Sequence, residues 1–201
     1  MMLTTFLAPE TAKILEIVAT VTFVAYLVLQ IMHSRWMWIL YIPSCVCAAL
    51  NFFNSATWAF GALNIYYVTM GFIGIYHWKK DSVHELEEGA ILLHKLGWKH
   101  LNISVVITIV GIPLLYFLLK GMNDPNPVLD AITTVLSIIG TWWLTHSYIQ
   151  QWWVWIVADI FAIWMNVNLG NEWFVVQFVL CIISSFIGLW NWNRKGTYIN
   201  E

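Results

Sequence analysis

The chain has 201 residues, of which 60% are hydrophobic and 10% are charged, and its formal net charge at pH 7 is -2. Since a soluble domain carries about 25% charged residues, this composition excludes an ordinary soluble domain and predicts a membrane protein. The near-zero net charge argues against a nucleic-acid partner. The three cysteines all lie in apolar segments, which predicts buried thiols rather than a disulfide framework.

Seven apolar segments follow one another along the chain, and as helices they suit a hydrocarbon layer about 30 Å thick. They are predicted over residues 14–32, 36–53, 58–78, 101–119, 128–146, 152–167 and 173–192. Pro43 lies inside the second segment, where neighbouring helices can absorb a kink. The sequence therefore predicts an all-α integral membrane protein with seven transmembrane helices.

The connection between the third and fourth segments, residues 81–100, is the one polar stretch of any length. We expect a short surface helix there, with Leu86, Ile91 and Leu92 facing the bilayer. The run that begins at His84 resembles the start of a zinc-protease helix, but its second histidine is missing, so no metal site is predicted. A membrane scaffold that binds a partner through this stretch is an alternative function.

Basic residues are distributed unequally between the two ends of the predicted helices. If the third helix ends in the cytoplasm, that side holds Arg35, Lys79, Lys80, Lys95, Lys99, Arg194 and Lys195. The other side holds only Lys13 and Lys120. Because cytoplasmic loops carry the excess of lysine and arginine, this bias predicts a cytoplasmic C-terminus and an N-terminus outside.

Two parts of the chain resemble each other in the same order. The similar pairs are residues 36–39 with 153–156, and residues 71–79 with 185–193. From Trp38 to Gly74 is 36 residues, and from Trp155 to Gly188 is 33. Similar motifs at similar spacing indicate an internal repeat.

The repeat predicts how the single transmembrane domain, residues 1–201, is organised. We expect two parallel three-helix repeats, residues 14–80 and residues 128–195. Since three helices are an odd number, the copies need one further crossing to point the same way. Residues 81–120 supply it as a cytoplasmic loop and a linker helix, which is a known transporter plan with the substrate held where the repeats meet.

The sixth predicted helix carries the most deeply placed ionisable group, Asp159. An aspartate in hydrocarbon costs roughly 2.5–3.5 kcal/mol on insertion scales, so its position indicates polar, lipid-free surroundings. Trp152, Trp155 and Asp159 are spaced i, i+3, i+7 and share one helical face, which suits a flat organic cation. The alternatives are interfacial anchoring for Trp152 and Trp153 and a structural hydrogen bond for Asp159, to Asn64 or Gln177.

Other polar side chains complete the predicted site. The predicted substrate-binding residues are Trp152, Trp155, Asp159, Asn64, Tyr67, Glu16, Gln177 and Trp190. For Glu16, a salt bridge with Lys13 is an equal alternative, and Asp130 is predicted to be interfacial or a helix cap. Glycines at 71, 74 and 188 are predicted to let helices approach closely.

Several devices that other functions need are missing from the sequence. There is no Walker loop, no Gly-x-Ser-x-Gly elbow and no series of carboxylates through successive helices. These gaps favour a passive facilitator that is not an enzyme and uses no cofactor. An intramembrane enzyme that pairs Asp159 with His77 or His146 is the alternative.

Three stretches resemble the Pnu-type vitamin transporters: Gly74–Trp78, Leu136–Ile138, and the Trp-x-x-Trp region from Tyr148 to Asp159. The resemblance extends from Glu16 to Trp192. Members of that family carry nicotinamide riboside, and relatives carry thiamine or riboflavin. The resemblance implies a three-plus-one-plus-three fold related to the SWEET sugar transporters, a bacterial inner membrane, and facilitated diffusion with trapping by a cytoplasmic kinase.

Carried over to this chain, the resemblance places Trp152 and Trp155 in the binding site and Asp159 one turn deeper. In nicotinamide riboside carriers the last position is often asparagine, and a glutamine tends to replace Asn64. Both nicotinamide riboside and thiamine are cations, so we expect nicotinamide riboside and keep thiamine as the alternative. The expected partners are this vitamin, the lipid bilayer and the kinase, and a homo-oligomer is left open.

Overall fold

The computed structural model describes residues 6–54, 58–81, 90–170 and 172–198. The chain divides into two compact units, Met1–Glu85 and Leu86–Glu201. The first contains α1 (Pro9–Ile31), α2 (Met37–Asn54) and α3 (Trp58–Asp81). The second contains β1 (Ile91–Leu93), α4 (Trp98–Gly121), α5 (Pro127–Thr145), α6 (Gln151–Leu169), α7 (Glu172–Lys195) and β2 (Gly196–Tyr198). The seven predicted helices are all present.

Six of these helices are long and apolar enough to cross a membrane. They are Pro9–Ile31, Met37–Asn54, Trp98–Gly121, Pro127–Thr145, Gln151–Leu169 and Phe174–Lys195. Among the described residues α3 is not one of the six, and it carries polar side chains such as Asn64 and His77. The all-helical membrane architecture is therefore confirmed, while a membrane crossing by α3 stays a prediction.

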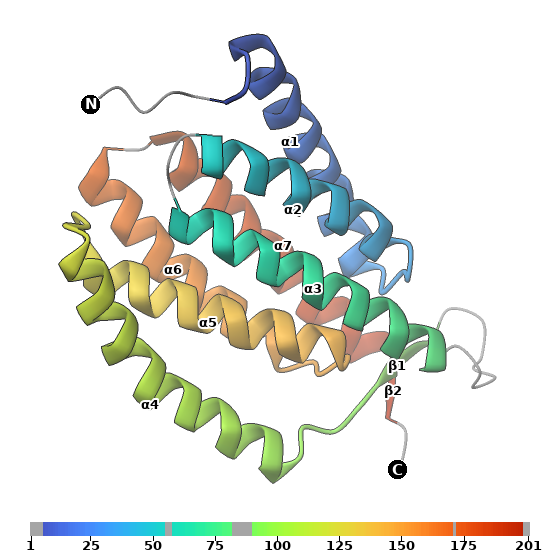
Figure 1. The fold of residues 1–201 in the computed structure, drawn as a ribbon. Helices are drawn as coiled ribbons and strands as arrows, with labels where there is room; N and C mark the ends of the chain where they lie inside the picture. The colour runs from blue at the N-terminus through green and yellow to red at the C-terminus, as the bar shows by residue number, and fades with distance from the viewer. Residues whose placement is uncertain (1–5, 55–57, 82–89, 171, 199–201) are drawn as a thin grey trace. The chain divides into compact units, whose positions relative to one another are not determined.

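In the first unit, successive helices pack against each other, α1 on α2 and α2 on α3 (Figure 1). Side-chain hydrogen bonds to backbone join α1 to α2, since Ser44 Oγ donates to the Ala19 carbonyl at 2.9 Å. Gly71 and Gly74 face side chains of α2, where an added Cβ would meet Ile42 and Trp38. The predicted packing role of these two glycines is confirmed.

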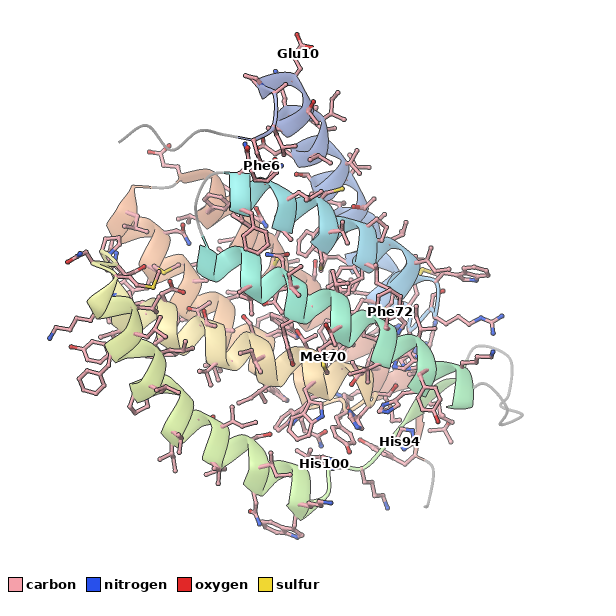
Figure 2. All side chains as sticks on the ribbon, in the orientation of Figure 1. Phe6, Glu10, Met70, Phe72, His94 and His100 are labelled. Atoms are coloured by element: carbon pink, nitrogen blue, oxygen red, sulfur yellow. The ribbon has the colours of Figure 1, made fainter. Side chains whose placement is uncertain are left out.

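In the second unit, α5 packs against both α4 and α6, and α6 packs in turn against α7. Two polar contacts fix α4 to the end of α5 and the turn that follows. Trp143 Nε1 donates to Ser104 Oγ at 3.0 Å, and the Tyr148 hydroxyl lies 3.0 Å from Nδ1 of His100, which Figure 2 labels on α4. These bonds connect α4 to α5 and to the turn after it.

The surface helix predicted within residues 81–100 is wrong where the structure describes this segment. Ile91 and Leu92 lie in β1, which pairs in parallel with β2, and Leu92 stands opposite Thr197. Both apolar side chains are buried instead of facing a bilayer, and Leu86 lies outside the described residues. A short apolar run does not reveal its own periodicity, and here it pairs with a distant strand.

The turn between α1 and α2 in the first unit matches the turn between α5 and α6 in the second. His33 and Ser147 both adopt the left-handed backbone region, with φ of 52° and 51°. The hydrogen bonds around them also match, because His33 N donates to Gln30 O and Ser147 N donates to Leu144 O, each at 3.0 Å. Each residue of the second turn lies 114 positions after its counterpart, as 147 lies after 33.

The aromatic contacts of the two units also match when residues 114 positions apart are compared. Trp38 packs on Gly74 of α3, and its ring centroid lies 5.6 Å from that of Trp78 in an edge-on contact. The corresponding residues of the second unit, 152, 188 and 192, make the same set of contacts, with ring centroids 5.3 Å apart. The tryptophan–glycine spacing is therefore 36 residues in both units.

This correspondence corrects the predicted alignment of the repeat. We expected Trp155 to be the counterpart of Trp38, but Trp152 occupies that place. The error came from the Trp-x-Trp-Ile motif, because sequence similarity does not show which tryptophan is buried. Trp38 and Trp152 are both almost completely enclosed.

Candidate substrate-binding site

The candidate site lies on α6, which is packed between α5 and α7. The helix begins at Gln151, directly after the left-handed turn at Ser147. It ends at Leu169, and the capping residue Gly170 has a φ of 71°, the left-handed conformation that glycine adopts at no steric cost. Because neighbours lie along both flanks, side chains on two faces of α6 are enclosed.

The two tryptophans of the Trp-x-x-Trp motif lie against different neighbours. Trp152 is buried against Gly188 of α7, so the predicted packing role of that glycine is confirmed. Trp155 packs on Gly140 of α5, where an added Cβ would lie 3.0 Å from its Cε2. Neither indole N–H has a hydrogen-bond partner among the described residues. Both are therefore available as donors.

The interfacial alternative, predicted for Trp152 and Trp153, fits only the second of these two residues. Trp153 is 53% exposed, whereas Trp152 is 2% exposed. Amphipathic rings that anchor a helix in the headgroup region need contact with the surroundings. Anchoring therefore suits Trp153 and does not suit Trp152.

Asp159 is buried on the same helix, and its Oδ2 has no hydrogen-bond partner within the described ranges. Gln177, one of the two residues suggested as a structural partner, lies on an exposed face of α7. Cys181 of α7 lies within electrostatic range of the carboxylate. Because an uncompensated buried charge is costly, a cation bound beside this carboxylate would stabilise its ionised form.

The second buried acid of this unit has a different environment. Asp130 lies in the first turn of α5, where a negative charge is favoured by the helix dipole, and its Oδ1 accepts from Thr134 Oγ1 at 3.1 Å. The predicted cap role is wrong, because Asn126 occupies the N-cap position. Asp130 is thus locally satisfied, unlike Asp159.

Three of the predicted site residues belong to the first unit, and two of them lie on α3. Asn64 and Tyr67 both lie on α3, the former buried and the latter half-buried. The ring of Tyr67 lies 6.1 Å from that of Tyr41 and 5.9 Å from that of Tyr66. The three tyrosines form an aromatic group on α2 and α3, and the role of Asn64 and Tyr67 toward a substrate stays a prediction.

The remaining predicted site residues are exposed. Glu16 lies on an exposed face of α1, and Gln177 on an exposed face of α7. Trp190 is 61% exposed, and the guanidinium carbon of Arg194 lies 5.5 Å from its ring centroid. Within the second unit, the structure thus gathers Trp152, Trp155 and Asp159 on α6 and leaves the other two apart.

One buried polar residue of α6, Gln151, was not among the predicted site residues. Gln151 has no exposed surface, and neither its Oε1 nor its Nε2 has a hydrogen-bond partner among the described residues. The signal that could have found it is the constant displacement of 114 positions, which aligns Gln151 with the apolar Met37. A polar residue at an otherwise apolar repeat position indicates a special role.

Comparison with known proteins supports the sequence resemblance. The family described as "Nicotinamide mononucleotide transporter" matches residues 13–194. A nicotinamide riboside transporter PnuC of Neisseria mucosa is 24% identical over 136 residues, covering 64% of this chain and 52% of the relative. The PnuC of Haemophilus influenzae is 23% identical over 128 residues, covering 64% and 56%. The chain thus spans little more than half the length of these relatives.

One solved structure has the same fold. It is described as the crystal structure of the vitamin B3 transporter PnuC, and it matches with a TM-score of 0.69 and 24% sequence identity. The match covers 90% of this chain and 80% of that one. At this level of identity the likeness concerns the fold, and the site has to be argued from the residues of this chain.

Proposed function

The chain belongs to the nicotinamide mononucleotide transporter family, and from this premise we propose that it carries nicotinamide riboside across a bacterial inner membrane by facilitated diffusion. The resemblance to the Pnu-type transporters is thereby confirmed, and the family is one of membrane transporters, not enzymes. A cytoplasmic kinase that phosphorylates the vitamin would trap it inside the cell. Transport would then need no other energy source.

The observation that carries the substrate proposal is the buried carboxylate of Asp159, whose Oδ2 has no partner among the described residues, on the same helix as Trp152 and Trp155. Nicotinamide riboside contains a flat pyridinium cation. Indole rings attract such a cation by their quadrupole, with about 2 kcal/mol or more when the contact is desolvated. The carboxylate adds a charge of opposite sign in the same enclosed region.

The charges of the described residues favour a nucleoside over a nucleotide. Of the aspartate, glutamate, lysine, arginine and histidine side chains among them, the two that are buried are Asp130 and Asp159. A phosphate group is normally held by arginine or lysine side chains, and the buried set contains neither. A buried acid would also repel a phosphate, so the mononucleotide itself suits this site poorly.

Thiamine is the second candidate, and Asp159 is the observation that favours it. Its thiazolium is also a flat cation, and a carboxylate stands here where nicotinamide riboside carriers often have asparagine. The aromatic and acidic groups of α6 suit either ring equally well. Only a direct comparison of binding separates the two vitamins.

For the transport cycle, we infer that α1–α3 and α5–α7 are parallel repeats and that α4 is the linker between them. The matching tryptophan–glycine contacts and left-handed turns of the two units support this arrangement. The distribution of basic residues supports an N-terminus outside and a cytoplasmic C-terminus. Transporters built from parallel repeats move their substrate by rocking one repeat against the other.

Uptake into vesicles tests this proposal. Purified protein in liposomes should take up radiolabelled nicotinamide riboside in a saturable way, down its gradient, and with no effect of a proton ionophore. Unlabelled nicotinamide riboside should compete, and the mononucleotide should not. If thiamine is taken up and nicotinamide riboside is not, the substrate proposal is wrong, and if neither is taken up, the transport proposal is wrong.

A further inference from the structure

The buried side-chain amide of Gln151 lacks hydrogen-bond partners among the described residues. Its side chain has no exposed surface, yet its amide donor and its amide acceptor both lack a partner among the described residues. Buried polar atoms in native proteins almost always find partners, so each exception calls for an explanation. Here two such atoms belong to one side chain at the entrance of α6.

The corresponding residue of the first unit shows that packing does not require this amide. Met37 begins α2 in the same backbone setting, since Met37 N donates to Ser34 O at 2.9 Å and Gln151 N donates to Tyr148 O at 3.1 Å. Met37 is also completely buried. An unbranched apolar side chain of similar length therefore satisfies this position of the framework, and the amide must serve another purpose.

The amide lies in line with the groups that make up the proposed site. Gln151, Trp155 and Asp159 are spaced i, i+4, i+8, so they form one stripe about 12 Å long on α6. Each of the three has a buried polar atom without a partner in the part of the chain that the structure describes. In order, they offer an amide, an indole N–H donor and a carboxylate acceptor.

We infer that Gln151 is a specificity-determining residue, which binds the uncharged, hydroxyl-bearing end of the substrate while Asp159 faces its cationic ring. This inference rests on the proposed function and deepens it. A glutamine amide both donates and accepts, as a sugar hydroxyl does, so the pair satisfies both amide atoms. The site then selects a cation that carries a polar arm over a bare aromatic cation.

Calorimetry with two ligands tests the inference on the purified full-length protein. The ligands are nicotinamide riboside and 1-methylnicotinamide, which has the same ring cation without the sugar. Gln151→Met should weaken nicotinamide riboside binding at least tenfold and change 1-methylnicotinamide binding less than twofold. Asp159→Asn should weaken both ligands. An unchanged affinity for nicotinamide riboside, or an equal loss for both ligands in Gln151→Met, overturns the inference.

Thermal unfolding of the ligand-free protein gives an independent readout. Without substrate the amide is unsatisfied, so Gln151→Met should leave the Tm unchanged or raise it. The reciprocal variant Met37→Gln should lower the Tm, because it buries an amide where the framework has a methionine. If Gln151→Met also lowers the Tm, the amide has a structural partner and the inference is overturned.

The binding data separate the failure of this inference from that of the proposed function. If the wild-type protein binds thiamine and not nicotinamide riboside, the proposed substrate is wrong. Gln151→Met should then weaken thiamine at least tenfold and spare a thiazolium that lacks the hydroxyethyl group, and equal effects would overturn the inference. A wild-type protein that binds neither vitamin overturns both proposals.

Discussion

Two acidic side chains of the second unit are buried, and they differ in what holds them. Asp130 accepts a hydrogen bond from Thr134, whereas Oδ2 of Asp159 has no partner among the described residues. Hydrogen bonds to charged groups contribute about 1.5–3 kcal/mol, and 1.4 kcal/mol is a factor of ten. Asp159→Asn should therefore weaken nicotinamide riboside binding roughly 10- to 100-fold, as measured by calorimetry.

Asp130→Asn is the matched control for that variant. It removes the same charge from a buried position of the same unit, but from a carboxylate that Thr134 already satisfies. We expect its affinity for the vitamin to stay within about twofold of the wild type. Equal losses in the two variants would mean that total negative charge matters, and that Asp159 has no direct role.

Single residues also mark the limit of what the sequence reveals. Trp152, Trp155 and Asp159 could be recognised because large aromatic side chains and a lone acid are conspicuous in an apolar helix. Gln150 and Gln151 precede them in sequence and look equivalent. Only the fold shows that Gln151 is fully enclosed and Gln150 is not. Burial depends on neighbours contributed by other helices, which composition does not specify.

At the level of helix packing, Gly188 determines how closely α7 approaches α6. A Cβ at Gly188 would overlap the ring of Trp152, and a Cβ at Gly74 would overlap the ring of Trp38. Overpacking of this kind costs about 1–3 kcal/mol. Both Gly188→Ala and Gly74→Ala should lower the Tm, whereas Gly121→Ala, with no atom within 4 Å of the added Cβ, should not. Indistinguishable unfolding curves for the three variants would contradict this packing.

The attachment of α4 to α5 depends on the bond from Trp143 to Ser104. Ser104→Ala leaves a buried indole N–H without an acceptor, which costs about 1–3 kcal/mol. Thermal unfolding should show this loss, while vitamin affinity should be unchanged if α4 is only a linker. Thr108→Ala is the control, because the Thr108 hydroxyl bonds to its own helix at 2.9 Å. A drop in affinity for Ser104→Ala would place α4 in the binding machinery.

Helices were easier to predict than strands or register for a physical reason. A membrane helix needs a long apolar run, and such runs stand out in the sequence. The strand Ile91–Leu93 is three residues long and exists only because Gly196–Tyr198 pairs with it. The alignment of the two repeats also depended on packing, because the sequence alone does not show whether Trp152 or Trp155 corresponds to Trp38.

For the whole molecule, the membrane orientation is the property most open to test. Glu10 and Lys195 lie near opposite ends of the chain, both with exposed side chains, and Figure 2 labels Glu10 at the start of α1. With the N-terminus outside, a membrane-impermeant maleimide should label Glu10→Cys in intact cells and Lys195→Cys only after lysis. The unmodified protein measures the background from its three native cysteines. The opposite labelling pattern would reverse the orientation.

The parallel pairing of β1 with β2 joins the beginning of the second unit to its end. Backbone hydrogen bonds between β1 and β2 therefore connect the two ends of the segment from Ile91 to Tyr198. Cutting the chain between Glu85 and Leu86 would leave this pairing intact. We expect the fragment that begins at Leu86, synthesised on its own, to keep the pairing of β1 with β2 and the fold of the second unit.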